Sequence, residues 1–73
     1  MRRFFFTGSL SAEECYGYYR GHIKYVVVTT DSGERVQLHF RHFQRFVDSS
    51  GFRGRFRLTV DDNNAFIALE KIN

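Results

Sequence analysis

Apolar and polar residues alternate along five stretches of this chain, which is the pattern of strands that bury one face. In the second stretch Ile23, Tyr25 and Val27 alternate with Val26 and Val28, so both faces of this strand are apolar. A strand of this kind is expected at the centre of a sheet, with Val27 among its core residues. The five predicted strands cover residues 3–10, 22–30, 35–40, 55–60 and 65–72.

Short polar segments separate two pairs of these strands. Residues 31–34 read Asp-Ser-Gly-Glu, and residues 61–64 read Asp-Asp-Asn-Asn. Both segments have turn chemistry, since Asx side chains and glycine favour tight reversals of the backbone. The chain therefore contains two predicted β-hairpins.

Two stretches have helical spacing instead. Ser11 and Glu14 form a capping box that begins a helix through about Tyr19, and Gly21 is placed to end it in a left-handed conformation. Later in the chain, apolar residues from Phe40 onward recur at helical spacing, which predicts one or two turns of helix over residues 41–47.

The predicted order of elements is β-α-β-β-α-β-β within one domain, residues 1–73. Short turns between strands favour an antiparallel arrangement, so the fold class is α+β. We expect a small antiparallel five-stranded sheet or an SH3-like partial barrel, with two short helices. Nine Phe and four Tyr favour an aromatic core. The predicted core residues are Phe4, Phe6, Val27, Leu38, Phe40, Phe43, Phe56, Leu58 and Leu69.

Cysteine content and hydropathy limit where such a domain functions. Cys15 is the sole cysteine, so no intrachain disulfide can form, and its place in the first helix predicts a buried, unreactive thiol. No apolar run approaches the ~18 residues of a membrane span. We therefore expect a cytoplasmic protein that does not engage a membrane.

Positive charge is concentrated in one part of the sequence. The whole chain carries +3, whereas residues 35–57 contain six arginines against Asp48 alone, a net +5. Within this window Arg53, Arg55 and Arg57 alternate, so their side chains lie about 6.6 Å apart on one face of a strand. This spacing is close to that of successive phosphates along a nucleic-acid strand, and arginine binds phosphate with a planar fork of donors.

Other residues could enlarge this basic face. Arg41 and Arg45, four apart on the second helix, are candidates to extend it, and Tyr16 and Phe52 are candidates to stack on bases. The alternative interpretation is that the three arginines of the strand face water because Phe56 and its alternate neighbours face the core.

No motif indicates catalysis or metal binding. His22, His39 and His42 lack the ligand spacings of a zinc site, and residues 61–64 lack the glycine and terminal glutamate of a calcium loop. No nucleophile lies near a base in a recognised arrangement. We expect no enzyme activity, no metal and no cofactor.

Several segments together resemble a known family. They are residues 18–21 (Tyr-Tyr-Arg-Gly), 31–35 (Asp-Ser-Gly-Glu-Arg), Phe46-Val47 leading to 51–56 (Gly-Phe-Arg-Gly-Arg-Phe), and the closing 69–72. Across nearly the whole chain the sequence is similar to domain-of-unknown-function family twenty-eight thirty-five, a short gammaproteobacterial family. Prolines are common near the second helix in that family, whereas this chain has none. The resemblance implies a bacterial, cytoplasmic, stand-alone protein and supplies no substrate, cofactor or catalytic residue.

The expected function is a small non-catalytic binding module, either for nucleic acid through the basic face or for another protein, a second copy included. We expect a monomer or a weak homodimer. The two functions differ in one structural feature. Nucleic-acid binding favours an open face shared by Arg41, Arg45, Arg53, Arg55 and Arg57. The protein-interaction alternative is favoured if the strand arginines are each paired with Asp48, Asp61, Asp62 or Glu70.

Overall fold

The computed structural model describes residues 1–73 and contains five strands, one α-helix and two short 3-10 helices. In chain order these are β1 (Arg2–Ser11), α1 (Ala12–Tyr19), β2 (Tyr25–Thr29), β3 (Arg35–His39), η1 (Phe40–His42), η2 (Gln44–Phe46), β4 (Gly51–Val60) and β5 (Phe66–Lys71). The α+β class and the antiparallel pairing of the strands agree with the sequence prediction.

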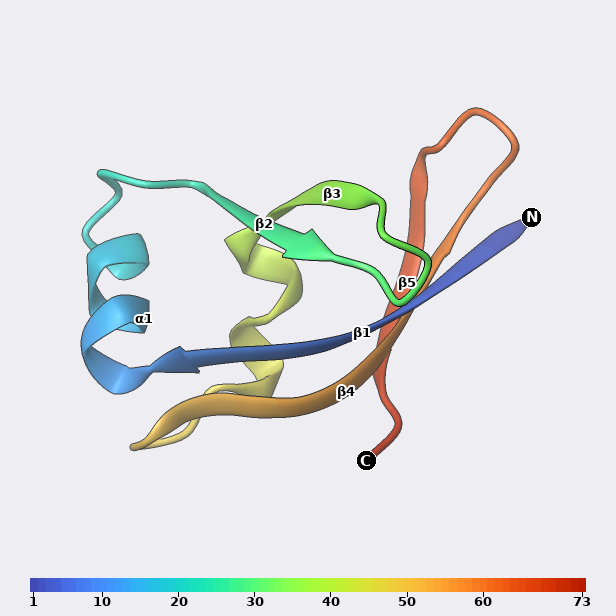
Figure 1. Ribbon diagram of the computed structural model, residues 1–73. Helices are drawn as coiled ribbons and strands as arrows, with labels where there is room; N and C mark the ends of the chain where they lie inside the picture. Colours follow the sequence, from blue (N-terminus) through green and yellow to red (C-terminus); the bar gives the residue numbers. More distant parts are fainter.

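The strands form two separate antiparallel sheets, so the prediction of one five-stranded sheet is wrong. One sheet has the order β1-β4-β5 and the other is the hairpin β2-β3. A backbone hydrogen bond links the β2–β3 turn to β1, in which the Asp31 N–H donates to the Phe5 carbonyl at 2.8 Å. Away from this point α1 lies between the sheets' ends, and the Tyr18 hydroxyl donates to the Tyr25 carbonyl at 3.3 Å. The start of β2 therefore meets the Tyr18 side chain. Figure 1 shows α1 between the end of β1 and the loop that leads into β2.

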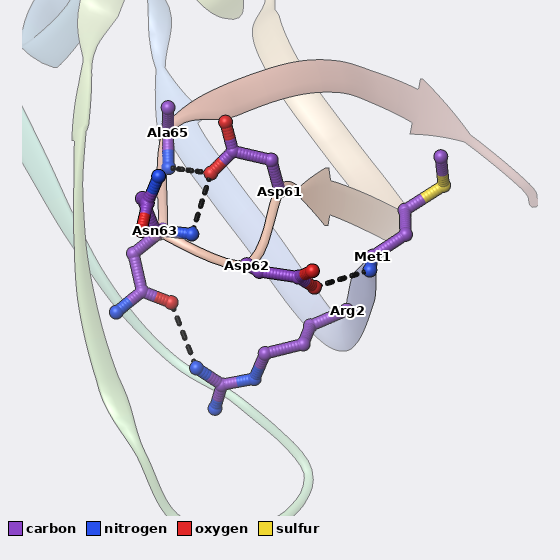
Figure 2. A network of polar contacts seen from close by, with 7 residues as sticks. Met1, Arg2, Asp61, Asp62, Asn63 and Ala65 are labelled. Carbon is purple, nitrogen blue, oxygen red and sulfur yellow. Dashed lines mark hydrogen bonds and ion pairs between the residues drawn. The ribbon is translucent and has the colours of Figure 1, made fainter.

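The first helix and both hairpins are confirmed. The Ser11 hydroxyl accepts from the Glu14 N–H at 3.1 Å, and the Glu14 carboxylate accepts from the Ser11 N–H at 3.0 Å, which completes the capping box. Gly21, just after the helix, has a φ of 81°. In the β4–β5 turn the Asp61 carboxylate accepts from the N–H groups of Asn63 and Ala65, at 2.8 and 2.9 Å (Figure 2). This is the predicted Asx turn.

The predicted second helix is absent, and two 3-10 turns occupy its place. Phe43 N–H donates to the Phe40 carbonyl and Phe46 N–H donates to the Phe43 carbonyl, which are bonds between residues three apart. In a 3-10 helix, side chains three apart eclipse one another, so phenylalanines at this spacing share one face. An α-helix would rotate them progressively off that face. The segment lies between the two sheets in Figure 1 and inserts its rings into the core.

The core is an aromatic cluster on the inner face of the larger sheet. The Phe56 ring contacts the rings of Phe6, Phe43, Phe46 and Phe52, with centroids between 5.3 and 5.7 Å apart. Seven predicted core residues are buried, namely Phe6, Leu38, Phe40, Phe43, Phe56, Leu58 and Leu69. Phe4 is half-buried at the edge of this cluster.

The orientation of β2 differs from the prediction. Val26 and Val28 are buried, whereas Val27 is 52% exposed. β2 also has a single neighbour, β3, so it is not a central strand. A strand that is apolar on both faces has no alternation to specify which face turns inward, so only its pairing with β3 decides the orientation.

No helix in the structure has the length and apolar character needed to cross a bilayer.

Candidate functional site

The strand arginines do share one face, but two of them are paired with carboxylates. Because Phe56 faces the core, Arg55 and Arg57 lie on the opposite, outer face of β4. Arg55 donates to both oxygens of Asp31, at 2.9 and 2.5 Å, and Arg57 donates twice to Glu70, at 2.9 and 3.1 Å. Arg53 is exposed and makes no ion pair.

The Arg55–Asp31 contact is a bidentate ion pair, and Arg55 also bonds to a hydroxyl group. The Arg55 guanidinium donates to the Thr7 hydroxyl at 3.0 Å, across the β1–β4 ladder. Its hydrogen bonds hold the pKa of Asp31 below the ordinary value, and the carboxylate in turn raises the pKa of Arg55. A phosphate ligand would have to compete with this carboxylate for the same donors.

The remaining two candidate arginines lie away from this face. Arg45 donates to the carbonyl oxygen of Leu69 on β5, and its guanidinium lies 4.7 Å from the Phe46 ring centroid. Arg41 follows β3 and lines a groove together with Phe66. Arg41 and Arg45 thus belong to the 3-10 segment packed on the inner face, so the five arginines do not form one continuous surface.

The two aromatic residues considered for base stacking also differ in position. Phe52 is buried and stacks on Phe43 with ring centroids 4.7 Å apart, so it belongs to the core. Tyr16 is 62% exposed on α1, where the Arg20 guanidinium lies 5.7 Å from its ring centroid. Phe52 is thus not free to stack on a base, and Tyr16 belongs to α1 instead of β4.

A groove separates β3 from β4 and β5. It consists of two adjoining cavities of about 430 and 290 Å³ that have residues 36 and 37, Leu58, Val60 and Asn64 in common. Leu58 and Val60 form a floor that is already buried. The accessible apolar surface lies at the rim. There Phe4 and Val36 are half-buried, and Phe66 is 39% exposed. A ligand in this groove would therefore contact the rim more than the floor.

One wall of the groove is the free edge of β3. The hydrogen bonds from the Phe40 N–H to the Lys24 carbonyl and from the Thr30 N–H to the Glu34 carbonyl mark the bonded pairs of the β2–β3 ladder. Bonded pairs recur every second residue, so Val36 and Leu38 face β2 with their backbone groups. The backbone groups of the alternate residues, Arg35, Gln37 and His39, consequently point away from β2, and β3 has no second neighbour.

The opposite wall, β5, is already occupied by side chains. Arg45 donates to the Leu69 carbonyl on its edge, and the His42 ring stacks on Phe66 with centroids 3.7 Å apart. Burial, together with the charge of Arg41 and the neighbouring His39, lowers the pKa of His42. A neutral imidazole therefore covers this end of β5, and β3 provides the open edge.

Charge along the groove is predominantly positive. At one end Arg2 donates to the Asn64 amide oxygen at 2.7 Å and lies 3.7 Å from Glu34. Arg35 at the start of β3 and Arg41 just beyond its end make no ion pair with any acidic side chain. Two guanidinium groups without acidic partners thus flank the free edge.

Sequence reasoning did not identify this groove. Val36 and Phe66 are thirty residues apart and belong to different sheets. No local sequence pattern indicates that β3 does not pair with the sheet of β5. The one sequence feature that pointed toward the groove is Arg35, which belongs to the basic window 35–57. Arg35 indicates a binding edge only once β3 is known to lie at the edge of its sheet.

Other reactive side chains are dispersed or buried. No group of three or more His, Cys, Asp or Glu residues is arranged to hold a metal ion. Cys15 is buried, and burial followed by the charge of Glu14 raises the pKa of its thiol. This raised pKa keeps Cys15 in the protonated, weakly nucleophilic form at neutral pH.

Residues 2–72 match the model of the family described as "Protein of unknown function (DUF2835)". The chain is therefore a small α+β protein that belongs to this family. No curated protein and no solved structure matches it.

Proposed function

We propose that this protein is a non-catalytic binding module that takes up an extended segment of another protein along the free edge of β3. The observation that carries this proposal is that the unpaired edge of β3 adjoins a groove whose rim is apolar. The outward backbone groups of Arg35, Gln37 and His39 supply donors and acceptors for a further strand. The rim residues Phe4, Val36 and Phe66 supply surface for its side chains.

The arrangement of the polar groups supports a binding role without catalysis. The groove contains His39 and His42, but no carboxylate or hydroxyl nucleophile lies within hydrogen-bonding distance of either ring. His39 accepts from the Arg41 N–H at 3.1 Å and His42 stacks on Phe66, so both imidazoles have structural contacts. Backbone recognition requires neither an activated base nor a cofactor.

Proline substitution at the free edge tests this proposal. The N–H of Gln37 points into the groove and takes no part in the β2–β3 ladder, so Gln37→Pro removes one donor from the edge and leaves the ladder intact. We expect peptides selected from a random display library on the parent protein to bind Gln37→Pro at least tenfold more weakly. Gln37→Ala retains the N–H, so its smaller loss reports the contribution of the side chain.

A matched control comes from the facing strand. Val27 is the cross-strand partner of Gln37, and its N–H points to the opposite side of the hairpin. Val27→Pro should therefore leave the binding of the selected peptides unchanged, while circular dichroism verifies that all three variants fold. A library that yields no ligand, or ligands that bind Gln37→Pro as tightly as the parent, would refute strand addition at β3.

Nucleic acid is the second candidate ligand, on the outer face of β4. The observation in its favour is that Arg53 is exposed and unpaired beside Arg55 and Arg57. The ion pairs of Arg55 and Arg57 make it the weaker candidate.

A further inference from the structure

We infer that the segment bound by β3 is acidic and that its apolar and acidic residues alternate. This inference rests on the proposed function, because it specifies the ligand of the same groove. It follows from the pleat of a strand added beside β3 and from the two guanidinium groups that flank this edge.

The pleat determines which ligand side chains enter the groove. Successive residues of an added strand point to opposite faces of the sheet, as those of β3 do. Ligand residues that align with Val36 and Leu38 point inward and meet Phe4 and Phe66 at the rim. This environment favours apolar side chains at every second position of the ligand.

The other ligand positions lie beside positive charge. They align with Arg35, Gln37 and His39, whose side chains occupy the outer surface of the hairpin. Arg41 lies two residues beyond the end of β3. The acidic residue that lines the groove, Glu34, already accepts a hydrogen bond from Ser32 and lies 3.7 Å from Arg2. Carboxylates of the ligand would therefore find the guanidinium groups of Arg35 and Arg41 without an internal competitor.

The same charges disfavour a second copy of this chain as the occupant. Antiparallel pairing of two β3 strands about Gln37 would place each Arg35 opposite a His39 of the other copy. It would also bring both copies of Arg35 and Arg41 to one junction between molecules that each carry +3. Repulsion among these four guanidinium groups opposes the pairing.

Two end-blocked synthetic peptides test this inference. Both match the five-residue length of β3; valine alternates with glutamate in the first and with glutamine in the second. Fluorescence anisotropy at low salt should show tighter binding of the glutamate peptide, by about two- to fivefold for each ion pair formed. This preference should decline as salt rises, since exposed charges are screened.

Single substitutions test whether Arg35 and Arg41 cause the preference for the glutamate peptide. Arg35→Gln and Arg41→Gln should each weaken binding of the glutamate peptide by about two- to fivefold and leave binding of the glutamine peptide unchanged. Arg53→Gln provides the matched control, because Arg53 is also exposed and unpaired but lies on the outer face of β4. It should change neither affinity.

The outcomes separate this inference from the proposed function. If the glutamine peptide binds as tightly as the glutamate peptide and Gln37→Pro abolishes both, strand addition stands and the acidic preference is wrong. If the glutamate peptide does not bind at all, the inference is overturned, and the display selection alone then decides the proposed function. A dimer in sedimentation that Gln37→Pro dissociates would assign the edge to a second copy and likewise overturn the inference.

Discussion

At the scale of single residues, one ring occupies the centre of the contacts that hold the molecule together. Phe56 is fully buried and contacts four other phenylalanine rings drawn from β1, the 3-10 segment and β4 itself. Offset and edge-on aromatic pairs add stabilisation beyond the area that they bury. In a chain of 73 residues, whose core is small, the loss of one such ring has a disproportionate effect.

We expect Phe56→Ala to lower the free energy of unfolding by about 3–5 kcal/mol, because it removes a large buried ring and leaves a cavity. A loss of that size is comparable to the total stability of a small domain. Phe5→Ala is the control: Phe5 is 39% exposed on the outer face, and its loss should cost about 1 kcal/mol or less. Urea denaturation measures both. Equal midpoints for the two variants would contradict the assignment of Phe56 to the centre of the core.

Acid should destabilise the protein through His42. Burial, Arg41 and His39 hold its folded-state pKa below the ordinary 6.5, so the folded state resists protonation. The stabilisation from neutral His42 is complete above the unfolded pKa and is lost as pH falls through the folded pKa. His42→Gln should therefore show a smaller fall in the urea midpoint between about pH 7.5 and about pH 5.5 than the parent does.

The exposed His22 serves as the control for this titration. His22→Gln should retain the acid sensitivity of the parent. If His42→Gln loses as much stability in acid as the parent, another group causes the effect.

At the scale of elements, close backbone packing decides where strands and loops meet. β4 begins at Gly51, which has a φ of 95°. A Cβ placed there would lie 2.0 Å from the Leu10 carbonyl oxygen of β1. Both the left-handed conformation and the close contact require glycine at this position. Gly17, in the middle of α1, has open space around its Cα and no such requirement.

These two glycines should respond to alanine with opposite signs. Gly51→Ala should destabilise the protein by more than about 1 kcal/mol, because it combines steric overlap with a strained φ. Gly17→Ala should stabilise it by about 0.4–1 kcal/mol, because alanine restricts the unfolded chain and favours the helix. Thermal melts of the two variants beside the parent provide the comparison. A stabilising Gly51→Ala would show that β4 does not begin as described.

At the scale of the whole molecule, the distribution of charge between two faces separates the candidate ligands. The outer face of β4 carries Arg53, Arg55 and Arg57, with the last two engaged by Asp31 and Glu70. The groove beside β3 has flanking guanidinium groups that no carboxylate engages. An anionic ligand should therefore prefer the groove over the outer face.

Binding of single-stranded RNA tests this preference. Because Arg53 alone of the three β4 arginines makes no ion pair, we expect a poly-uridine oligonucleotide to bind weakly or undetectably at about 50 mM salt. Replacing Arg53, Arg55 and Arg57 together by glutamine should then leave any residual affinity almost unchanged. If the parent binds and the triple variant reduces the log–log salt slope by about 2–3 units, the outer face is a phosphate-binding surface.

The sequence by itself determined the local structure wherever one strong local signal was present. The capping box of Ser11 and Glu14, the Asx turn at Asp61 and the inward set around Phe56 and Leu58 all appear as predicted. In each of these, residues close in the chain carry the whole physical cause. The family was also identified from the chain as a whole, and the match over residues 2–72 confirms it.

Only the tertiary structure decided how these pieces combine. The orientation of Val27, the 3-10 form of residues 40–46 and the division into two sheets depend on contacts between distant segments. The same holds for the candidate site: alternation placed the three arginines of β4 on one face, but Asp31 and Glu70 reach two of them only after folding. The open edge of β3 exists because the hairpin does not pair across the groove with the sheet of β1, β4 and β5. Pairing between strands far apart in sequence leaves no local pattern that would reveal it.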